Sequence, residues 1–379
     1  MLFALDANSP RCRVFEKLNA ELLLFLQNSI KARQFRRTLF SQSTGQECWA
    51  NAKTQEKFKA VFRNLPKDEA ARAGIYNSIN RSQNLSELFS DKSVAVPNIS
   101  PFKLFDALKA LTTHLFTRTK DLAGVVREAG ESIEQHYQSY VRANSELCYI
   151  CATSALSHNR FNVADNDQWR SDYDHLLCKD KYPAFSCHPD NFIPTCHICN
   201  SKAKGAKDML FDGARRRKAF YPLPPLNQSF YGKVLVEPIF SGLALFAADG
   251  NINPLRTATI NYSNPTPDER EMIEVWVGLY QVPKRVGERI ATNFCEYIDG
   301  DCTPEDFDDF CYQISRKARR EPMDIKTTEW RFWWFRLYEW LSAQAEDVKR
   351  DAWELIDWKR TQVIINNNAV NTYGSLERE

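Results

Sequence analysis

Two pairs of cysteines near the middle of the chain have the spacing of metal-binding knuckles. These C-x2-C pairs, separated by 44 residues, are Cys148 with Cys151 and Cys196 with Cys199. Two such pairs can place four thiolates around one tetrahedral zinc ion. Cys178 and Cys187 lie between the pairs, but neither belongs to a C-x2-C pair. The pattern therefore predicts a structural zinc site made by the four paired cysteines, with Cys178 and Cys187 as bystanders.

Polar residues between and beside the knuckles have the side chains that phosphodiester hydrolysis needs. Asp174 and His175 are adjacent, Asn191 follows after 15 residues, and Asn200 directly follows the last knuckle cysteine. A histidine can take a proton from water near neutral pH. Carboxylate and amide oxygens suit Mg²⁺ or Mn²⁺, which can stabilise charge on a phosphate.

This order of residues resembles the HNH endonuclease family in its zinc-stapled form. The resemblance covers about residues 148–205 and depends on three stretches, Asp172–His175, Asp190–Cys196 and Cys199–Lys202. It implies a ββα-metal module, in which a two-stranded hairpin and a helix surround one catalytic cation. It also implies that His175 ends the first strand, that Asn191 lies in the returning loop and that Asn200 lies on the first helical turn.

The same resemblance implies a role for each site residue. His175 would be the general base, while Asp174 and Asn200 would hold the catalytic Mg²⁺ or Mn²⁺. Asn191 would brace the loop and orient His175, and Asp172 would support the site from the same strand face. Because adjacent strand residues point to opposite faces, Asp174 and His175 can serve one site only at a strand end or a bulge.

A basic segment follows the module. Between residues 196 and 233 there are eight Lys or Arg residues and two acids, a local excess of six positive charges. Such a segment can hold a phosphate backbone without reading its sequence. HNH proteins usually carry a lysine three residues after the helical asparagine, and here that position is Ala203. We therefore expect nucleic-acid contacts from the neighbouring basic residues, Lys202, Lys204, Lys207, Arg215, Arg216 and Arg217.

The elements around this module are predicted to be helical. Apolar residues recur at helical spacing in residues 14–25 and 102–115, and the pattern changes after Cys148. Residues 233–236 and 257–262 favour a short antiparallel pair with a turn at 249–251. Helical signals return at Thr266-Pro267 and at Thr303-Pro304. We predict a mostly helical α+β protein with an N-terminal domain at 1–145, the nuclease module at 146–232 and a C-terminal domain at 233–379.

Two further segments have alternative interpretations. Six of the nine tryptophans lie between Trp330 and Trp358, a stretch that favours core or a protein interface over a base-stacking platform. Seven acids and no base lie between Glu296 and Asp309, which favours a solvated surface over a DNA mimic or a docking site for a basic partner.

Composition limits the function classes. The 379 residues carry a formal net charge of only +2, so any nucleic-acid binding has to depend on a local basic region. The sequence shows neither a secretory signal nor an apolar stretch that could cross a bilayer. We expect a cytoplasmic, metal-dependent endonuclease acting on DNA. Its large helical additions resemble anti-phage defence effectors of the Septu and retron-associated kind, controlled by a partner such as an ATPase. The alternatives are a non-catalytic zinc-stabilised adaptor and the same nuclease acting on RNA.

Overall fold

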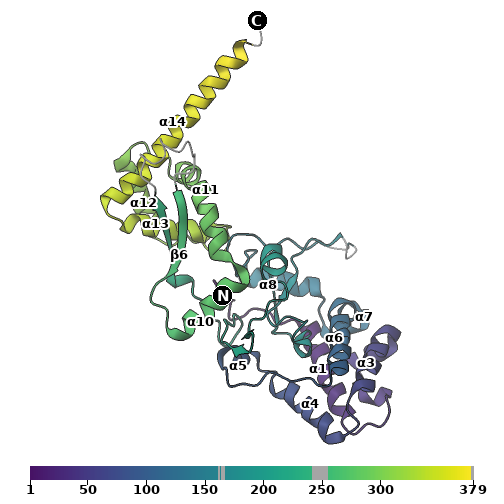
Figure 1. Cartoon of the computed structure of the whole chain (residues 1–379). Coiled ribbons are helices and arrows are strands. Elements are labelled where there is room, and N and C mark those ends of the chain that lie inside the picture. The colour runs from purple at the N-terminus through teal and green to yellow at the C-terminus, as the bar shows by residue number, and fades with distance from the viewer. Residues whose placement is uncertain (161–162, 164–166, 241–254, 377–379) are drawn as a thin grey trace. The chain divides into compact units, whose positions relative to one another are not determined.

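The computed structural model describes residues 1–160, 163, 167–240 and 255–376 (Figure 1). It is mostly helical with three two-stranded antiparallel sheets in this part of the chain, which confirms the α+β class. Two compact units divide the chain: unit 1 contains Met1–Tyr231 and Thr266–Tyr280, and unit 2 contains Gly232–Pro265 and Gln281–Glu379.

This division differs from the three predicted domains. The predicted N-terminal and nuclease domains share one unit, and the predicted boundary at 232/233 lies one residue from the observed one. Residues 266–280, which we assigned to the C-terminal domain, belong to unit 1. Trp276 of this segment donates its indole N–H to the carbonyl oxygen of Ile150 at 3.1 Å, and Glu271 pairs with Lys92 at 3.1 Å. These contacts connect the segment to unit 1 across more than a hundred residues of chain.

The N-terminal part of unit 1 is a group of short helices. Its elements are α1 (Arg13–Ser29), η1 (Arg37–Leu39), α2 (Thr44–Ala50), α3 (Ala52–Asn64), α4 (Glu69–Arg81), α5 (Leu85–Ser90), α6 (Phe102–Thr117), η2 (Thr119–Asp121), α7 (Ala123–Ala129) and α8 (Ile133–Asn144). Figure 1 shows α1, α3, α6 and α7 lying together. The predicted periodicity explains the packing of α1, because all four residues of its apolar stripe are fully buried: Val14, Leu18, Leu22 and Phe25.

Helix ends follow the local capping rules. The side chain of Asp68 accepts the backbone N–H of Ala71 at the start of α4, and Ser132 and Gln135 form a capping box at the start of α8. The predicted cap at Thr266 is also present: Thr266 and Glu269 exchange side-chain and backbone hydrogen bonds before α10 (Pro267–Tyr280).

The middle of unit 1 contains short elements in place of long helices. They are β1 (Tyr173–His175), η4 (Pro183–Phe185), β2 (Phe192–Pro194), η5 (Ile198–Lys204), β3 (Phe211–Asp212), β4 (Arg215–Arg216) and η6 (Tyr231–Lys233), the last of which runs into unit 2. The strands β1 and β2 pair antiparallel, with Asp174 opposite Ile193 and His175 opposite Phe192. The hairpin and the following η5, a π-helix, thus occur in the chain order that the HNH resemblance implies.

Unit 2 begins with the predicted antiparallel pair. The strands β5 (Val234–Phe240) and β6 (Leu255–Tyr262) are antiparallel, and the predicted turn at 249–251 lies outside the described residues. The helices that follow are α11 (Val282–Cys302), α12 (Phe307–Ala318), α13 (Arg331–Ala343) and α14 (Glu346–Leu376). The predicted start near Thr303 is displaced, because Asp306 caps α12 by accepting the backbone N–H of Asp309 at 2.8 Å.

The tryptophan-rich and acidic segments both contribute to the packing of unit 2. Trp333 and Trp334 of α13 are buried, as expected for core residues. Within the acidic run, Asp301 pairs with Lys317 at 2.9 Å, and Asp299 pairs with Arg360. Part of the acidic run is therefore neutralised internally. None of the helices in the described part of the chain combines the length and apolar character that a bilayer span requires.

Candidate functional site

The four knuckle cysteines form one buried cluster. The ligand atoms of Cys148, Cys151, Cys196 and Cys199 all lie within 4.8 Å of one another, and the sulfurs of Cys151 and Cys196 are 3.8 Å apart. Zn–S bonds of about 2.3 Å in a tetrahedron put sulfur atoms about 3.8 Å apart. The cluster therefore has the donor type, number and spacing of a structural zinc site.

Backbone and hydroxyl groups support this cluster. The hydroxyl of Thr153 donates to the sulfur of Cys151 at 3.2 Å, and the backbone N–H of Cys196 donates to the sulfur of Cys148 at 3.5 Å. Hydrogen bonds to sulfur stabilise the thiolate form that a metal requires. Cys178 and Cys187 lie outside the cluster, as predicted, and donate to backbone carbonyl oxygens elsewhere in unit 1.

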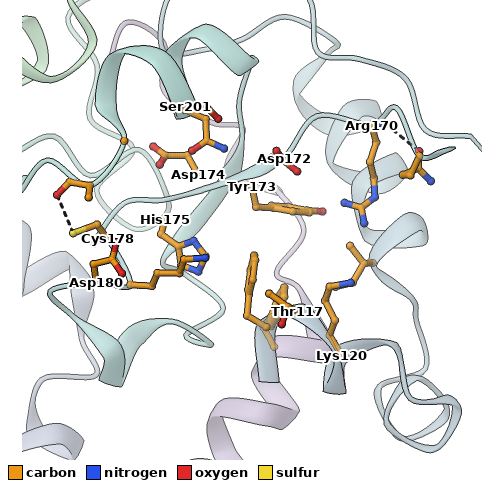
Figure 2. Close-up of a pocket in the computed structure, with 18 residues that line it drawn as sticks. Thr117, Lys120, Arg170, Asp172, Tyr173, Asp174, His175, Cys178, Asp180 and Ser201 are labelled. Carbon is orange, nitrogen blue, oxygen red and sulfur yellow. Dashed lines mark hydrogen bonds between the residues drawn. The ribbon is translucent and has the colours of Figure 1, made fainter. Parts of the chain in front are cut away.

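The hairpin and η5 bring three predicted site residues to one cavity. Asp174, His175 and Asn200 all line a cavity of about 520 Å³ in unit 1, part of which is shown in Figure 2. His175 is the last residue of β1 and Asn200 is the third residue of η5. Because β1 ends at His175, two adjacent residues reach the same cavity, as expected at a strand end.

Asn191 has a different place. It is fully buried immediately before β2. Its side-chain oxygen accepts the backbone N–H of Leu177 at 2.7 Å, and its amide donates to the carbonyl oxygens of Leu177 and Phe185 at 3.0 and 2.9 Å. These three bonds hold the loop between β1 and β2 closed. Asn191 therefore positions the loop, in agreement with the bracing role, while the cavity is lined by other residues.

His175 is held with a defined tautomer. Its Nε2 lies 3.1 Å from the carbonyl oxygen of Ser186. A carbonyl oxygen only accepts, so Nε2 carries the proton and Nδ1 is the basic nitrogen. Burial lowers the pKa of His175 to about 3, and the positive charge of Lys204 contributes to this lowering. The imidazole is therefore neutral at physiological pH, and in this buried setting it is a weaker base than an exposed histidine.

Asp174 forms a buried ion pair that the sequence did not reveal. Its Oδ1 lies 2.6 Å from Nζ of Lys204, and its Oδ2 accepts the hydroxyl of Tyr280 at 3.0 Å. The ammonium of Lys204 also donates to the carbonyl oxygen of His175. Burial raises the pKa of Asp174, while Lys204 and Tyr280 oppose the rise. Tyr280 lies 106 positions further along the chain, so no local motif could have indicated this contact.

This ion pair corrects one predicted nucleic-acid contact. The Lys204 side chain is only 1% exposed and its charge is directed to Asp174, so in this conformation it is not available to a phosphate backbone. Asp172 is exposed, lines the cavity and accepts the backbone N–H of Thr195 through its own carbonyl oxygen. Among the described residues, no ion pair involves Lys202, which is exposed beside the cavity-lining Ser201.

The rest of the basic segment is largely used within unit 1. Arg216 and Arg217 donate to backbone carbonyl oxygens, including those of Leu210 and Asp208. Arg215 and Lys207 are exposed. Arg215 pairs with Glu271 at 3.4 Å, and Lys207 donates to the carbonyl oxygen of Gly278 at 3.4 Å. Arg215 and Arg216 form strand β4.

Sequence reasoning missed several cations at the cavity. Lys120, Arg170 and Lys179 line it together with Asp174 and His175. Figure 2 shows Lys120 and Arg170 beyond Tyr173 as seen from His175. Lys120 comes from η2, within the predicted N-terminal domain, so one wall of the cavity lies outside the nuclease module.

No protein-family model matches the chain, and no match was found among curated proteins or solved structures.

Proposed function

We propose that the protein is a metal-dependent HNH-type endonuclease that hydrolyses DNA phosphodiester bonds. The observation that carries this proposal is the convergence of Asp174, His175 and Asn200 on one cavity, beside a buried cluster of four cysteines. The chain order of hairpin, asparagine and helix is the order that the HNH resemblance implies. Lys120 and Arg170 of the cavity lining pair with Asp121 and Glu134, which leaves Lys179 as the lining cation best placed to meet a polyanionic substrate.

His175 is the proposed general base. With Nε2–H bound to the Ser186 carbonyl oxygen, Nδ1 takes the proton from an attacking water. The water oxygen forms a bond to phosphorus, and the bond from phosphorus to the 3′-oxygen breaks. The leaving 3′-oxygen takes a proton from solvent, which balances the proton held by His175. Asn191 keeps the loop that contains Ser186 in place.

Asp174 and Asn200 have the donor chemistry for the proposed cation. Both residues line the cavity and carry side-chain oxygen atoms, and each Asp174 carboxylate oxygen has a second lone pair beyond the hydrogen bond that it accepts. When bound, Mg²⁺ or Mn²⁺ would stabilise the negative charge that develops on the phosphate and the leaving oxygen. Lys204 lies beside the same carboxylate and repels a second cation, so cation binding is expected to be weak without substrate.

The experiment is a plasmid-cleavage assay with Mg²⁺ or Mn²⁺, comparing the wild type with His175→Ala. His197→Ala is the matched control, because His197 is an exposed histidine next to a knuckle cysteine. We expect nicking by the wild type and by His197→Ala, and none by His175→Ala. Equal, EDTA-resistant cleavage by the wild type and His175→Ala would show that this mechanism is wrong.

A parallel assay on total tRNA separates a DNA nuclease from an RNA nuclease, because backbone hydrolysis by this site needs no group unique to DNA. The same assays, repeated with the proteins encoded beside this one, test the proposal that a partner such as an ATPase controls the nuclease in anti-phage defence.

The second candidate function is a non-catalytic, zinc-stabilised adaptor. The observation that favours it is the Asp174–Lys204 pair, which neutralises the proposed metal ligand. This candidate predicts no cleavage of DNA or RNA under any cation or partner condition, together with an intact zinc site.

A further inference from the structure

A second cavity, in unit 2, combines aromatic and cationic side chains. Its volume is about 280 Å³, and it lies between α11, α12 and α13. Figure 1 shows these helices lying together near β6. Its aromatic lining includes Tyr297, Trp334 and Tyr338, and its cationic lining consists of Arg316, Lys317, Arg320 and Arg331.

The aromatic lining is rigid. The rings of Tyr297 and Trp334 stack with centroids 3.8 Å apart and an angle of 8° between their planes. The hydroxyl of Tyr338 donates to Asp301 at 2.7 Å. These contacts hold in place the rings that form the apolar surface of the cavity wall. A surface of this kind suits a flat heteroaromatic ring.

Two of the four cations are held by carboxylates and two are not. Lys317 contacts Asp301 at 2.9 Å and Arg331 contacts Asp324 at 3.1 Å, so both are held by carboxylates. Arg316 and Arg320 are exposed, and within the described part of unit 2 neither has an ion-pair partner. The cavity therefore has two uncompensated positive charges, from Arg316 and Arg320.

Helix stabilisation explains only part of this arrangement. Basic residues in the last turn of α12 interact favourably with the helix dipole, which accounts for Arg316 and Lys317. Arg320 lies beyond the end of α12 at Ala318, and Arg331 belongs to α13. Because Arg331 is held by Asp324, the position of Arg320 at the aromatic-lined cavity is what these stabilising contacts leave unexplained.

We propose that this cavity binds a nucleotide unit, with its base against the aromatic lining and its phosphate at Arg316 and Arg320. A phosphate monoester carries about −1.5 to −2 charges at neutral pH, and a backbone phosphodiester carries about −1, so two uncompensated arginines can neutralise either group. Guanidinium groups bind phosphate oxygens in a bidentate manner. Pockets for drug-sized ligands have volumes of about 300–1,000 Å³. The cavity of 280 Å³ lies at the lower limit of this range, so its ligand is no larger than a mononucleotide.

The nucleotide unit can be free in solution or part of a single strand. Isothermal titration calorimetry of the full chain, without added Mg²⁺ or Mn²⁺, distinguishes these sources by using thymidine 5′-monophosphate and a short oligothymidylate as probes. Thymidine and ribose 5-phosphate are the control ligands, since each lacks one half of the proposed ligand. Binding requires no cleavage, so the outcome does not depend on the proposed nuclease activity.

The decisive variant is Arg316→Gln/Arg320→Gln, and its matched control is Arg319→Gln. Arg319 is exposed in the same segment but does not line the cavity. We expect saturable binding of at least one probe, weakened about tenfold or more in the double variant because charged hydrogen bonds are lost. Binding should be unchanged in Arg319→Gln, because Arg319 does not line this cavity.

Binding of the mononucleotide identifies a free nucleotide as the ligand, and binding of the oligonucleotide alone identifies a strand. The proposal is overturned if neither probe binds saturably at millimolar concentration. It is also overturned if thymidine or ribose 5-phosphate binds as tightly as the probes, or if Arg319→Gln weakens binding as much as the double variant does.

Discussion

The substitution Lys204→Met tests whether the Asp174–Lys204 pair is a buried structural ion pair. The two side chains are 1% and 3% exposed, so water cannot replace the lost ammonium. Removing one partner of a buried pair costs about 3–5 kcal/mol. Because Tyr280 still donates to Asp174 in the variant, we expect the lower end of that range, about 3 kcal/mol at pH 7.

The measurement is urea unfolding, with hydrogen exchange to localise the change to residues 173–204. Lys202→Met is the control, because Lys202 is exposed two positions away, and its effect should stay within about 0.5 kcal/mol. Asp174→Asn combined with Lys204→Met removes both charges and should restore most of the lost stability.

The pH dependence provides an independent check. Burial already raises the pKa of Asp174 in the wild type, and losing Lys204 removes the main opposing charge. The folded variant therefore prefers the protonated carboxyl more strongly than the unfolded chain does. Its stability penalty should be greatest at pH 7 and should shrink as the pH falls through the raised pKa. A penalty below about 0.5 kcal/mol at pH 7, equal to that of Lys202→Met, would refute a buried charge pair.

Three further predictions concern the zinc cluster, a buried histidine and two glycines. Cys196→Ser should lose the tightly bound zinc, about one ion per chain, and unfold the cluster, whereas Cys187→Ser should retain it, as measured by metal analysis. Burial lowers the pKa of His136 to about 4, so the folded protein favours the neutral imidazole. The free energy of unfolding should therefore fall by about 3 kcal/mol as the pH is lowered from 6.5 toward 4. His136→Gln should flatten this pH dependence in urea titrations. Gly205→Ala should destabilise the protein by about 1–3 kcal/mol, because Gly205 has φ +51°, which strains a residue with a Cβ. Gly74→Ala should stabilise it by about 0.5–1 kcal/mol, because Gly74 lies within α4 with open space around it. Thermal unfolding measures both effects.

Local sequence patterns predicted the elements whose residues are close in the chain or joined by a recognisable spacing. The buried stripe of α1, the capping box before α10 and the β5–β6 pair follow from periodicity, capping residues and strand propensity. The cysteine cluster was also predictable, because each knuckle supplies two ligands from one short turn. The HNH resemblance implied that His175 ends a strand and that Asn200 lies on the first turn of a helix, and the structure has them on these elements.

Tertiary structure alone decided how the charges around this site are used. Lys204 belonged to a basic run that predicted phosphate contacts, yet packing buries it against Asp174 and Tyr280. The same packing brings α10 into unit 1 and Lys120 to the cavity wall. The sequence shows which residues are charged but not which of them pair with one another. Contacts between residues more than 100 positions apart leave no periodic pattern in the sequence. The chain by itself therefore determined which groups are available for chemistry, and only the fold determined which of them face the cavity and which neutralise one another.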